Sequence, residues 1–321
     1  MTLMEIATCY VPGSIGNFGP GLDVLGAATS GGGDSVTATW HESPGVYVLD
    51  PGHPDLPRDA DRHASAIAAA AILRTASAAG VRLPRRGVGL TVRKGLPLSG
   101  GQGGSAASAV AGAVATNTLL GSPCDRNAII LAALESESRL AGRHLDNIAP
   151  SLLGGICLVR SVDPVDIIQL PVPARLRVVL AHPAQELRTA DSRAVLPAQV
   201  ERARVIRQMA NVAAIVAALY SDDLQLLGRA MDDQLAEPAR SPLIQGFAAA
   251  KAAALEAGAL GASISGAGPT MFAVCDSDVG AQRVSHAVRA AYEGLGVAAA
   301  VRVARIDTQG ARIERSPVGT G

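Results

Sequence analysis

The sequence contains few aromatic residues and has no excess of charge of either sign. Phe, Trp and Tyr make up only 2% of its 321 residues, too few to form a base-stacking surface for single-stranded nucleic acid. Lys and Arg together number 28, and so do Asp and Glu. No electrostatic patch for a polyanion is therefore expected, and the sequence argues against a nucleic acid or a membrane as a partner.

Paired cysteines and long apolar runs are also missing. The cysteines are far apart and form no C-x-x-C pair, which excludes a zinc site or a disulfide framework of the usual spacing; they are Cys9, Cys124, Cys157 and Cys275. The longest apolar runs, 66–73 and 212–220, are far short of the roughly 20 residues that span a bilayer. The first ten residues do not resemble a signal peptide. A cytoplasmic protein with reduced thiols is the default expectation.

The residues that are present predict a folded α+β chain. Apolar residues make up 48% of the sequence, enough for one large domain or two ordinary ones. Strand-like and helix-like segments mix in both halves, and 171–173 is a Pro-Val-Pro junction between two expected lobes, 1–170 and 171–306, with a frayed tail at 307–321. The main expected strands are 5–9, 35–40, 45–49 (paired with 35–40) and 88–93, and the main expected helices are 63–77, 105–120, 125–141, 197–220 and 242–257.

A glycine-rich loop at 96–104 precedes the expected helix at 105–120. Glycines allow backbone N–H groups to converge on an anion, and a helix N-terminus adds free donors, with Ser105 at the predicted N-cap. The alternative is a flexible turn before a helix, and the glycines alone do not decide between them. The loop lacks the Lys-Ser/Thr of a Walker A motif, and no following strand ends in the acidic residue of a dinucleotide site.

Two other loops combine small residues with polar side chains. The first, 11–23, places Asn17 and Asp23 across a Gly-Pro-Gly turn, where they could face one ligand. The second, 263–270, reads S-I-S-G-A-G-P-T between two expected strands and permits close backbone approach. Taken separately, each loop could equally be an ordinary turn.

Together and in this order, the three loops resemble the signature motifs of the GHMP kinase superfamily. The motifs are P-x-S-x-x-N-x-G-P-G-x-D at 12–23, P-x-x-x-G-x-G-S-S-A-A at 97–107 and S-G-A-G-P-T at 265–270. Within that superfamily the chain is similar to the homoserine kinase family. Three further segments favour homoserine kinases over the other members of the superfamily. They are H-L-D-N-I-A-P at 144–150, T-A-D-S-R-A-V-L-P at 189–197 and E-P-A-R-S-P-L-I at 237–244.

The resemblance implies a two-lobed GHMP kinase fold with the active site between the lobes. It consists of an N-terminal ribosomal-protein-S5-like lobe that binds ATP and a C-terminal ferredoxin-like lobe, and the family is commonly homodimeric. The implied reaction is the ATP-dependent phosphorylation of the L-homoserine hydroxyl to O-phospho-L-homoserine, a step of threonine biosynthesis. Phosphoryl transfer of this kind depends mainly on positioning and charge neutralisation.

The resemblance also assigns residues. Asp23 and Arg193 are the expected catalytic residues, with Asp23 either a general base or a group that only orients the hydroxyl. Ser105 and Glu137 are the expected Mg²⁺ ligands, with Glu135 as second choice. The expected substrate-binding residues are Asn17, Asp23, His144, Asn147, Thr189, Arg193 and Arg240. The expected ATP-binding residues are Pro97, Ser99, Gly100, Gly101, Gln102, Gly103, Gly104, Ser105 and Ala106.

Three residues and one glycine run depart from the family pattern. Gly104 replaces the first Ser of the pair, Gln102 replaces a Leu, and His63 replaces an Asn expected near the adenine; a Gly-Gly-Gly run at 31–33 precedes the strand expected at 35–40, where a more regular stretch is expected. These departures leave other functions open: a sister GHMP kinase or decarboxylase with another small hydroxylated substrate, or a non-catalytic nucleotide or metabolite binder on the same scaffold.

Overall fold

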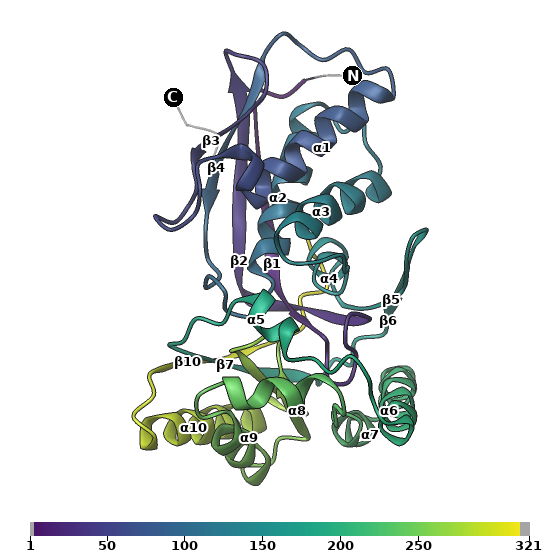
Figure 1. Ribbon diagram of the computed structural model, residues 1–321, viewed down its shortest axis with the longest axis vertical. Coiled ribbons are helices and arrows are strands. Elements are labelled where there is room, and N and C mark those ends of the chain that lie inside the picture. Colours follow the sequence, from purple (N-terminus) through teal and green to yellow (C-terminus); the bar gives the residue numbers. More distant parts are fainter. Residues whose placement is uncertain (1–2, 315–321) are drawn as a thin grey trace.

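The computed structural model describes residues 3–314 and has two lobes stacked along its long axis (Figure 1). Seven strands form the sheet of the N-terminal lobe in the order β11-β1-β2-β4-β3, and β5 pairs with β2 and with β6. The strands are β1 (Ile6–Gly16), β2 (Leu25–His41), β3 (Val46–Asp50), β4 (Gly87–Arg93), β5 (Ile156–Val162), β6 (Val165–Leu170) and β11 (Arg312–Glu314). The helices of this lobe are η1 (Ala60–Arg62), α1 (Ala64–Ala78), α2 (Gly104–Leu119), α3 (Arg126–Leu140) and α4 (Ile148–Leu153).

Helix α2 is the centre of the N-terminal lobe. It packs against β1 and β2 on one side and against α1 and α3 on the other. Its sequence is Ala, Gly and Val on nearly every side, with Ala106, Ala109 and Ala113 fully or almost fully buried. A helix that is apolar all round is buried by its neighbours, and this burial fixes the direction in which the N-terminus of α2 points.

The C-terminal lobe contains a four-stranded antiparallel sheet in the order β10-β7-β9-β8. Residues in β7 alternate between two apolar clusters: Val178 and Leu180 face α6 and α7, whereas Val179 and Ala181 face α9 and α10. The strands are β7 (Arg177–Pro183), β8 (Gly261–Ile264), β9 (Met271–Cys275) and β10 (Ala299–Ala304). The helices are α5 (Thr189–Ala194), α6 (Arg202–Ser221), α7 (Leu224–Arg229), α8 (Ala236–Arg240), η2 (Ser241–Leu243), α9 (Phe247–Glu256) and α10 (Asp278–Gly294).

The two lobes share an apolar junction. Phe18, from the loop after β1, stacks on Phe272 of β9 with ring centroids 5.4 Å apart. Ile15 and Leu25 of the N-terminal lobe belong to the same buried cluster as the strands of the C-terminal sheet. This packing places the loop at 17–23 directly at the boundary between the lobes.

The mixed α+β class is confirmed, but several predicted elements differ. Strand β3 pairs in parallel with β4, and not with β2 as predicted. The predicted helix at 197–220 is shorter at its start, since α6 begins at Arg202, and the predicted helix at 242–257 is a 3-10 turn followed by α9, because Gly246 adopts a φ of +71°. Helix α3 and its predicted Asp125 cap are confirmed, with Asp125 accepting a hydrogen bond from the Ala128 N–H at 2.8 Å.

The N-cap of α2 and the carboxyl end also differ from prediction. Gly103, with a φ of +68°, is the N-cap of α2 in place of Ser105. Residues 312–314 form β11 on β1 and are not a frayed tail; 315–321 lie outside the described residues. The lobe boundary at 170/171 stays a prediction. Within 3–314, every helix is too short or too polar to cross a lipid bilayer.

Candidate active site

A cavity of about 630 Å³ opens between the lobes. Its walls come from both lobes: the glycine-rich loop and α2, the segment 137–147, the start of α5, Arg240 and residues 266–268. The structure brings to this cavity Asn17, Asp23, Pro97, Ser99, Gly100, Gly101, Gly103, Gly104, Ser105, Ala106, Glu137, His144, Asn147, Thr189, Arg193 and Arg240. Gln102 and Glu135 are the two predicted site residues that do not line it.

The glycine-rich loop is held by its carbonyl groups. The Gly100 carbonyl accepts a hydrogen bond from Thr270 Oγ1 at 2.5 Å, and the Gly101 carbonyl accepts one from Ser265 Oγ at 2.6 Å. The Gln102 carbonyl accepts one from the Ser14 N–H at 3.0 Å. The signature segments at 12–23 and 265–270 therefore hold the glycine-rich loop through hydrogen bonds to its carbonyl groups.

This fastening fixes the direction of the next three N–H groups. In a trans peptide the N–H points opposite to the preceding carbonyl, so the N–H groups of Gly101, Gln102 and Gly103 face away from these attachments. No acceptor for them occurs among residues 3–314. Added to the N-terminus of α2, they form a cradle for an anion such as a phosphate.

Gly103 is required in this conformation. Its φ is +68°, and a Cβ built on it would lie 2.1 Å from Ser14 Oγ. Any larger residue would have to adopt the left-handed region and displace the first signature loop.

Glu137 and Ser105 fit a hard cation beside the cradle. Glu137 is 4% exposed, and its Oε1 has no hydrogen-bond partner within the described chain. Burial raises the pKa of the Glu137 carboxyl, and a hydrogen bond from Ser105 offsets part of that rise. An unpaired carboxylate oxygen beside a hydroxyl is the donor set that Mg²⁺ prefers. Glu135 was wrong as the second choice, because it forms ion pairs with Arg74 and Arg139 at the surface.

Gln102 is predicted to bind ATP, but its side chain does not line the cavity. Its side chain is 6% exposed and points into the lobe junction, where Oε1 accepts a hydrogen bond from Arg302 Nη2 at 3.1 Å. Its Nε2 donates to Thr270 Oγ1 at 3.4 Å. Only the backbone of Gln102 faces the cradle, because consecutive residues of the tight loop point in different directions.

Two arginines and one carboxylate occupy the other end of the cavity. Arg193 Nη2 and Asp23 Oδ1 form an ion pair at 2.6 Å. Arg240 is 2% exposed, and it donates from Nε to the Ser192 carbonyl at 3.1 Å and from Nη1 to the Gly266 carbonyl at 3.0 Å. Burial, followed by the positive charge of Arg193, lowers the pKa of Arg240.

Arg240 has no carboxylate partner within 4 Å among residues 3–314. A buried guanidinium is costly unless an anion offsets its charge. The unpaired guanidinium of Arg240 therefore makes this end of the cavity suited to a ligand that carries its own carboxylate.

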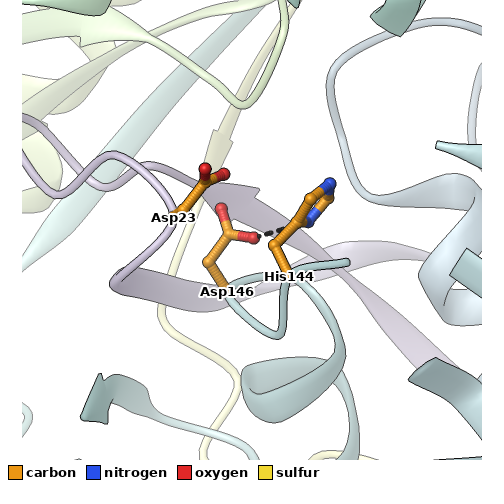
Figure 2. A group of neighbouring side chains, drawn as sticks. All are labelled: Asp23, His144 and Asp146. Carbon is orange, nitrogen blue, oxygen red and sulfur yellow. Dashed lines mark hydrogen bonds and ion pairs between the residues drawn. The ribbon is translucent and has the colours of Figure 1, made fainter. Parts of the chain in front are cut away.

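A hydrogen-bonded network connects the two ends, with Asp146 at its centre. Asp146 Oδ1 and His144 Nδ1 lie 3.0 Å apart, and Asp146 Oδ2 accepts a hydrogen bond from the Asn17 N–H at 2.9 Å. Figure 2 shows the Asp146 carboxylate between Asp23 and His144. Burial lowers the pKa of His144, but the hydrogen bond and charge of Asp146 outweigh it, so the pKa lies above its ordinary value.

Asp23, His144 and Asp146 could in principle hold a metal ion, because their ligand atoms lie within 4.8 Å of one another. Both Asp146 oxygens already accept hydrogen bonds from the protein, and Asp23 is paired with Arg193. The cluster therefore positions side chains, and the cation is better placed at Glu137.

Comparison with known proteins agrees with this geometry. Residues 64–155 match the model of the GHMP kinases N terminal domain, and residues 215–294 match that of GHMP kinases C terminal. The homoserine kinase of Chlorobium phaeobacteroides is 39% identical over 91% of this chain and 93% of its own. The homoserine kinase of Arabidopsis thaliana is 38% identical over 96% of this chain and 84% of its own. The chain belongs to the homoserine kinase family.

Solved structures give the same result. The crystal structure of homoserine kinase from Cytophaga hutchinsonii superposes with a TM-score of 0.91 at 38% identity, covering 98% of this chain and 99% of that one. The crystal structure of L. major mevalonate kinase in complex with R-mevalonate superposes with a TM-score of 0.67 at 19% identity over 96% of this chain and 97% of its own. The second likeness shows the shared fold alone.

In this homoserine kinase family member, Asn17 lines the cavity, and both ends of its amide are bonded to the protein. Its Nδ2 donates to the Gly266 carbonyl at 2.9 Å, and its Oδ1 accepts from the Asp23 N–H at 3.0 Å. The amide oxygen thus holds the backbone of Asp23, which has a φ of +60°. Asn17 lines the cavity and fixes the direction of the Asp23 carboxylate.

Sequence reasoning missed two members of the homoserine kinase site. Asp146 lies inside the H-L-D-N segment, but no role was predicted for it. Lys94 lines the cavity, is paired with the buried Asp34, and donates to the Gly104 carbonyl at 3.2 Å and to Ser108 Oγ at 3.1 Å. Its signal in the sequence is that it is one of two lysines and stands directly before the glycine-rich loop.

His63, which departs from the family pattern, lines the same cavity at the start of α1. It is 2% exposed, and its Nδ1 lies 2.9 Å from Ser65 Oγ. Burial lowers the pKa of His63, so the ring is neutral at pH 7.

Proposed function

We propose that this protein transfers the γ-phosphoryl group of ATP to the side-chain hydroxyl of L-homoserine, giving O-phospho-L-homoserine for threonine biosynthesis. The observation that carries the proposal is a single cavity with a backbone phosphate cradle at one end and two guanidiniums beside a carboxylate at the other. The family relationship supports the same substrate, since relatives at 38–39% identity bear that name.

The nucleotide end neutralises charge. The N–H groups of Gly101, Gln102 and Gly103 and the N-terminus of α2 would bind the phosphates. Ser105 and Glu137 would hold Mg²⁺, which would offset the negative charge of the phosphates when bound. The site residues present fit that ion, because Glu137 Oε1 is unpaired within the described residues and Glu137 and Ser105 both line the cavity.

The other end binds the amino acid. Arg240 and Arg193 would receive the α-carboxylate, and Asp23 would then be free of Arg193 to bind the ammonium or the hydroxyl. His144, Asn147 and Thr189 complete the wall of this subsite. His144 Nε2 has no partner among the described residues, which suits a contact with bound substrate.

In the transfer step the homoserine hydroxyl oxygen forms a bond to the γ-phosphorus, and the bond from that phosphorus to the β,γ-bridging oxygen breaks. The hydroxyl proton passes to Asp23 or to a γ-phosphate oxygen. A carboxylate with an ordinary pKa of about 3.9 is a weak base for an alcohol, so both routes stay open. In either route Asp23 directs the hydroxyl toward the phosphate.

The test is a substrate panel. ADP release is measured with Mg-ATP and L-homoserine, L-serine, L-threonine, mevalonate or galactose. We expect turnover with L-homoserine, and the loss of that turnover in Asp23→Ala while the thermal midpoint stays unchanged. Turnover with another hydroxylated substrate would indicate a sister kinase, release of CO₂ would indicate a decarboxylase, and nucleotide binding without turnover would indicate a binder. The cytoplasmic location and the homodimer remain predictions from the resemblance.

A further inference from the structure

An arginine of the C-terminal lobe reaches the back of the phosphate cradle. Arg302 lies on β10, and its guanidinium crosses the lobe junction to Gln102, where Nη2 donates to Oε1 at 3.1 Å. The same guanidinium donates from Nη1 to the Ser30 carbonyl and from Nη2 to Thr29 Oγ1, the latter at 3.4 Å. One side chain thus contacts β2 of the N-terminal lobe and the phosphate loop together.

The guanidinium lies against the glycine run of β2. Gly31 has a φ of +82°, and a Cβ on it would lie 3.3 Å from Arg302 Nη1; a Cβ on Gly32 would lie 3.6 Å from Nη2 and 3.4 Å from Leu96 Cδ2. Gly33 is required for another reason, because a Cβ there would lie 2.4 Å from the Val11 carbonyl oxygen. The register of β1 and β2 also shifts here, between Pro12 and Gly13.

Arg302 forms no ion pair with any carboxylate in the described part of the chain. Burial lowers its pKa, with Tyr10 acting in the opposite direction. An ordinary structural arginine in such a place would be paired with an acid. The neutral Gln102 amide takes that position instead, which keeps negative charge away from the anion cradle.

Gln102 transmits the contact to the rest of the loop. Its Nε2 donates to Thr270 Oγ1, which in turn donates to the Gly100 carbonyl. The Gln102 carbonyl is bound by the Ser14 N–H. The side chain and the carbonyl of one residue are thus fixed at the same time, and the N–H groups on either side of it belong to the cradle.

We propose that Arg302 and Gln102 form a cross-lobe latch that positions the phosphate loop for the nucleotide. Arg302 and Gln102 are positioning residues, because they act through the loop backbone and not by contact with substrate. The latch ties the phosphate loop to β10 of the C-terminal lobe, and its effect is confined to the nucleotide end of the site. This inference rests on the proposed function for its substrates.

The test separates nucleotide binding from homoserine binding. Dissociation constants for Mg-ADP are measured by calorimetry, and KM for ATP and for homoserine by ADP release, in Arg302→Met, Gln102→Leu and the double variant. We expect Arg302→Met to weaken Mg-ADP binding and raise KM for ATP about tenfold while KM for homoserine changes less than twofold. Arg302→Lys, which keeps the charge but not the planar fork, should recover only part of the loss.

The double variant tests the coupling. If the two residues act as one latch, Gln102→Leu costs little once Arg302 is already Met, so the two effects are not additive. The matched control is Arg289→Met, an exposed arginine that donates to the Val301 carbonyl on the same strand, and it should leave both constants unchanged. Thermal midpoints are recorded for every variant, and Gln102→Leu by itself carries the test should Arg302→Met not fold.

Three results would overturn the latch: unchanged Mg-ADP binding in a folded Arg302→Met or Gln102→Leu variant, equal rises in KM for both substrates, or additive effects in the double variant. Failure of the proposed function is distinguishable, because a wild-type protein that binds Mg-ADP but does not phosphorylate homoserine still allows the binding series to be measured.

Discussion

The two ends of the cavity are built by different means. At the nucleotide end the ligand-facing groups are backbone N–H groups, held in place by hydrogen bonds to the carbonyls of residues 100–102. At the homoserine end they are side chains, chiefly Asp23, Arg193 and Arg240. A backbone cradle recognises the phosphate group common to many reactions, whereas charged side chains distinguish one small substrate from another. Substitutions at the two ends should therefore fail in different ways.

The largest effect is expected at the carboxylate of the homoserine end. Asp23→Ala removes the group that directs the hydroxyl and should lower kcat about 10³-fold, within the range for a positioned acid–base group. Mg-ADP binding should not change. ADP release and calorimetry measure the two quantities, and Asp191→Ala, at an exposed acid on α5 paired with Arg188, is the matched control. Weaker Mg-ADP binding in Asp23→Ala would contradict the assignment of Asp23 to the homoserine end alone.

The next largest effect is expected at the buried guanidinium. Arg240→Met should lower kcat/KM for homoserine about 10²-fold, because loss of one member of a buried charge pair costs about 2–5 kcal/mol. KM for ATP should stay unchanged. Because Arg240→Met also removes the hydrogen bonds to the Ser192 and Gly266 carbonyls, the thermal midpoint should fall by a few degrees. A lower midpoint with unchanged kinetics would make Arg240 a structural residue.

A smaller effect is expected at the backbone end. Gly103→Ala forces a side chain into the left-handed region, which costs roughly 1–2 kcal/mol, and places its Cβ against Ser14 Oγ. Mg-ADP binding should weaken about tenfold, with KM for homoserine unchanged. Ser14→Ala in the same chain should recover part of the loss by removing the close contact. If Gly103→Ala binds Mg-ADP normally, the cradle does not depend on this conformation.

The smallest effect is expected from pH. The pKa of His144 lies above its ordinary value of 6.5 in the folded protein, because Asp146 outweighs burial. Folding therefore favours the protonated ring, and that stabilisation is fully present below pH 6.5 and is lost as pH rises through the folded pKa. We expect KM for homoserine to rise several-fold over the same window, and His144→Gln to abolish this dependence. A pH profile that His144→Gln leaves unaltered would contradict a role for this histidine.

Local sequence was sufficient for the elements and loops whose causes are local. The cap at Asp125 and the buried nature of α2 follow from residue types within one segment. The glycines and prolines of the motif segments at 12–23, 97–107 and 265–270 likewise predicted turns and close backbone approach. Ser105 failed as an N-cap because Gly103 can adopt a backbone conformation that begins the helix earlier.

The arrangement of these segments was decided only by tertiary packing. Asn17 meets the Gly266 carbonyl, and Asp23 meets Arg193, across separations of 249 and 170 residues. Tertiary packing also decided between Glu135 and Glu137 as the metal-ligand candidate. Glu135 forms an ion pair with Arg74 at the surface, whereas Glu137 lines the cavity. The sequence, through its resemblance to the family, indicated most of the candidate groups, but not Asp146 and Lys94, whose roles depend on contacts made in the folded chain. Packing of the two sheets determined which of these groups meet, because direction and burial belong to the assembled fold.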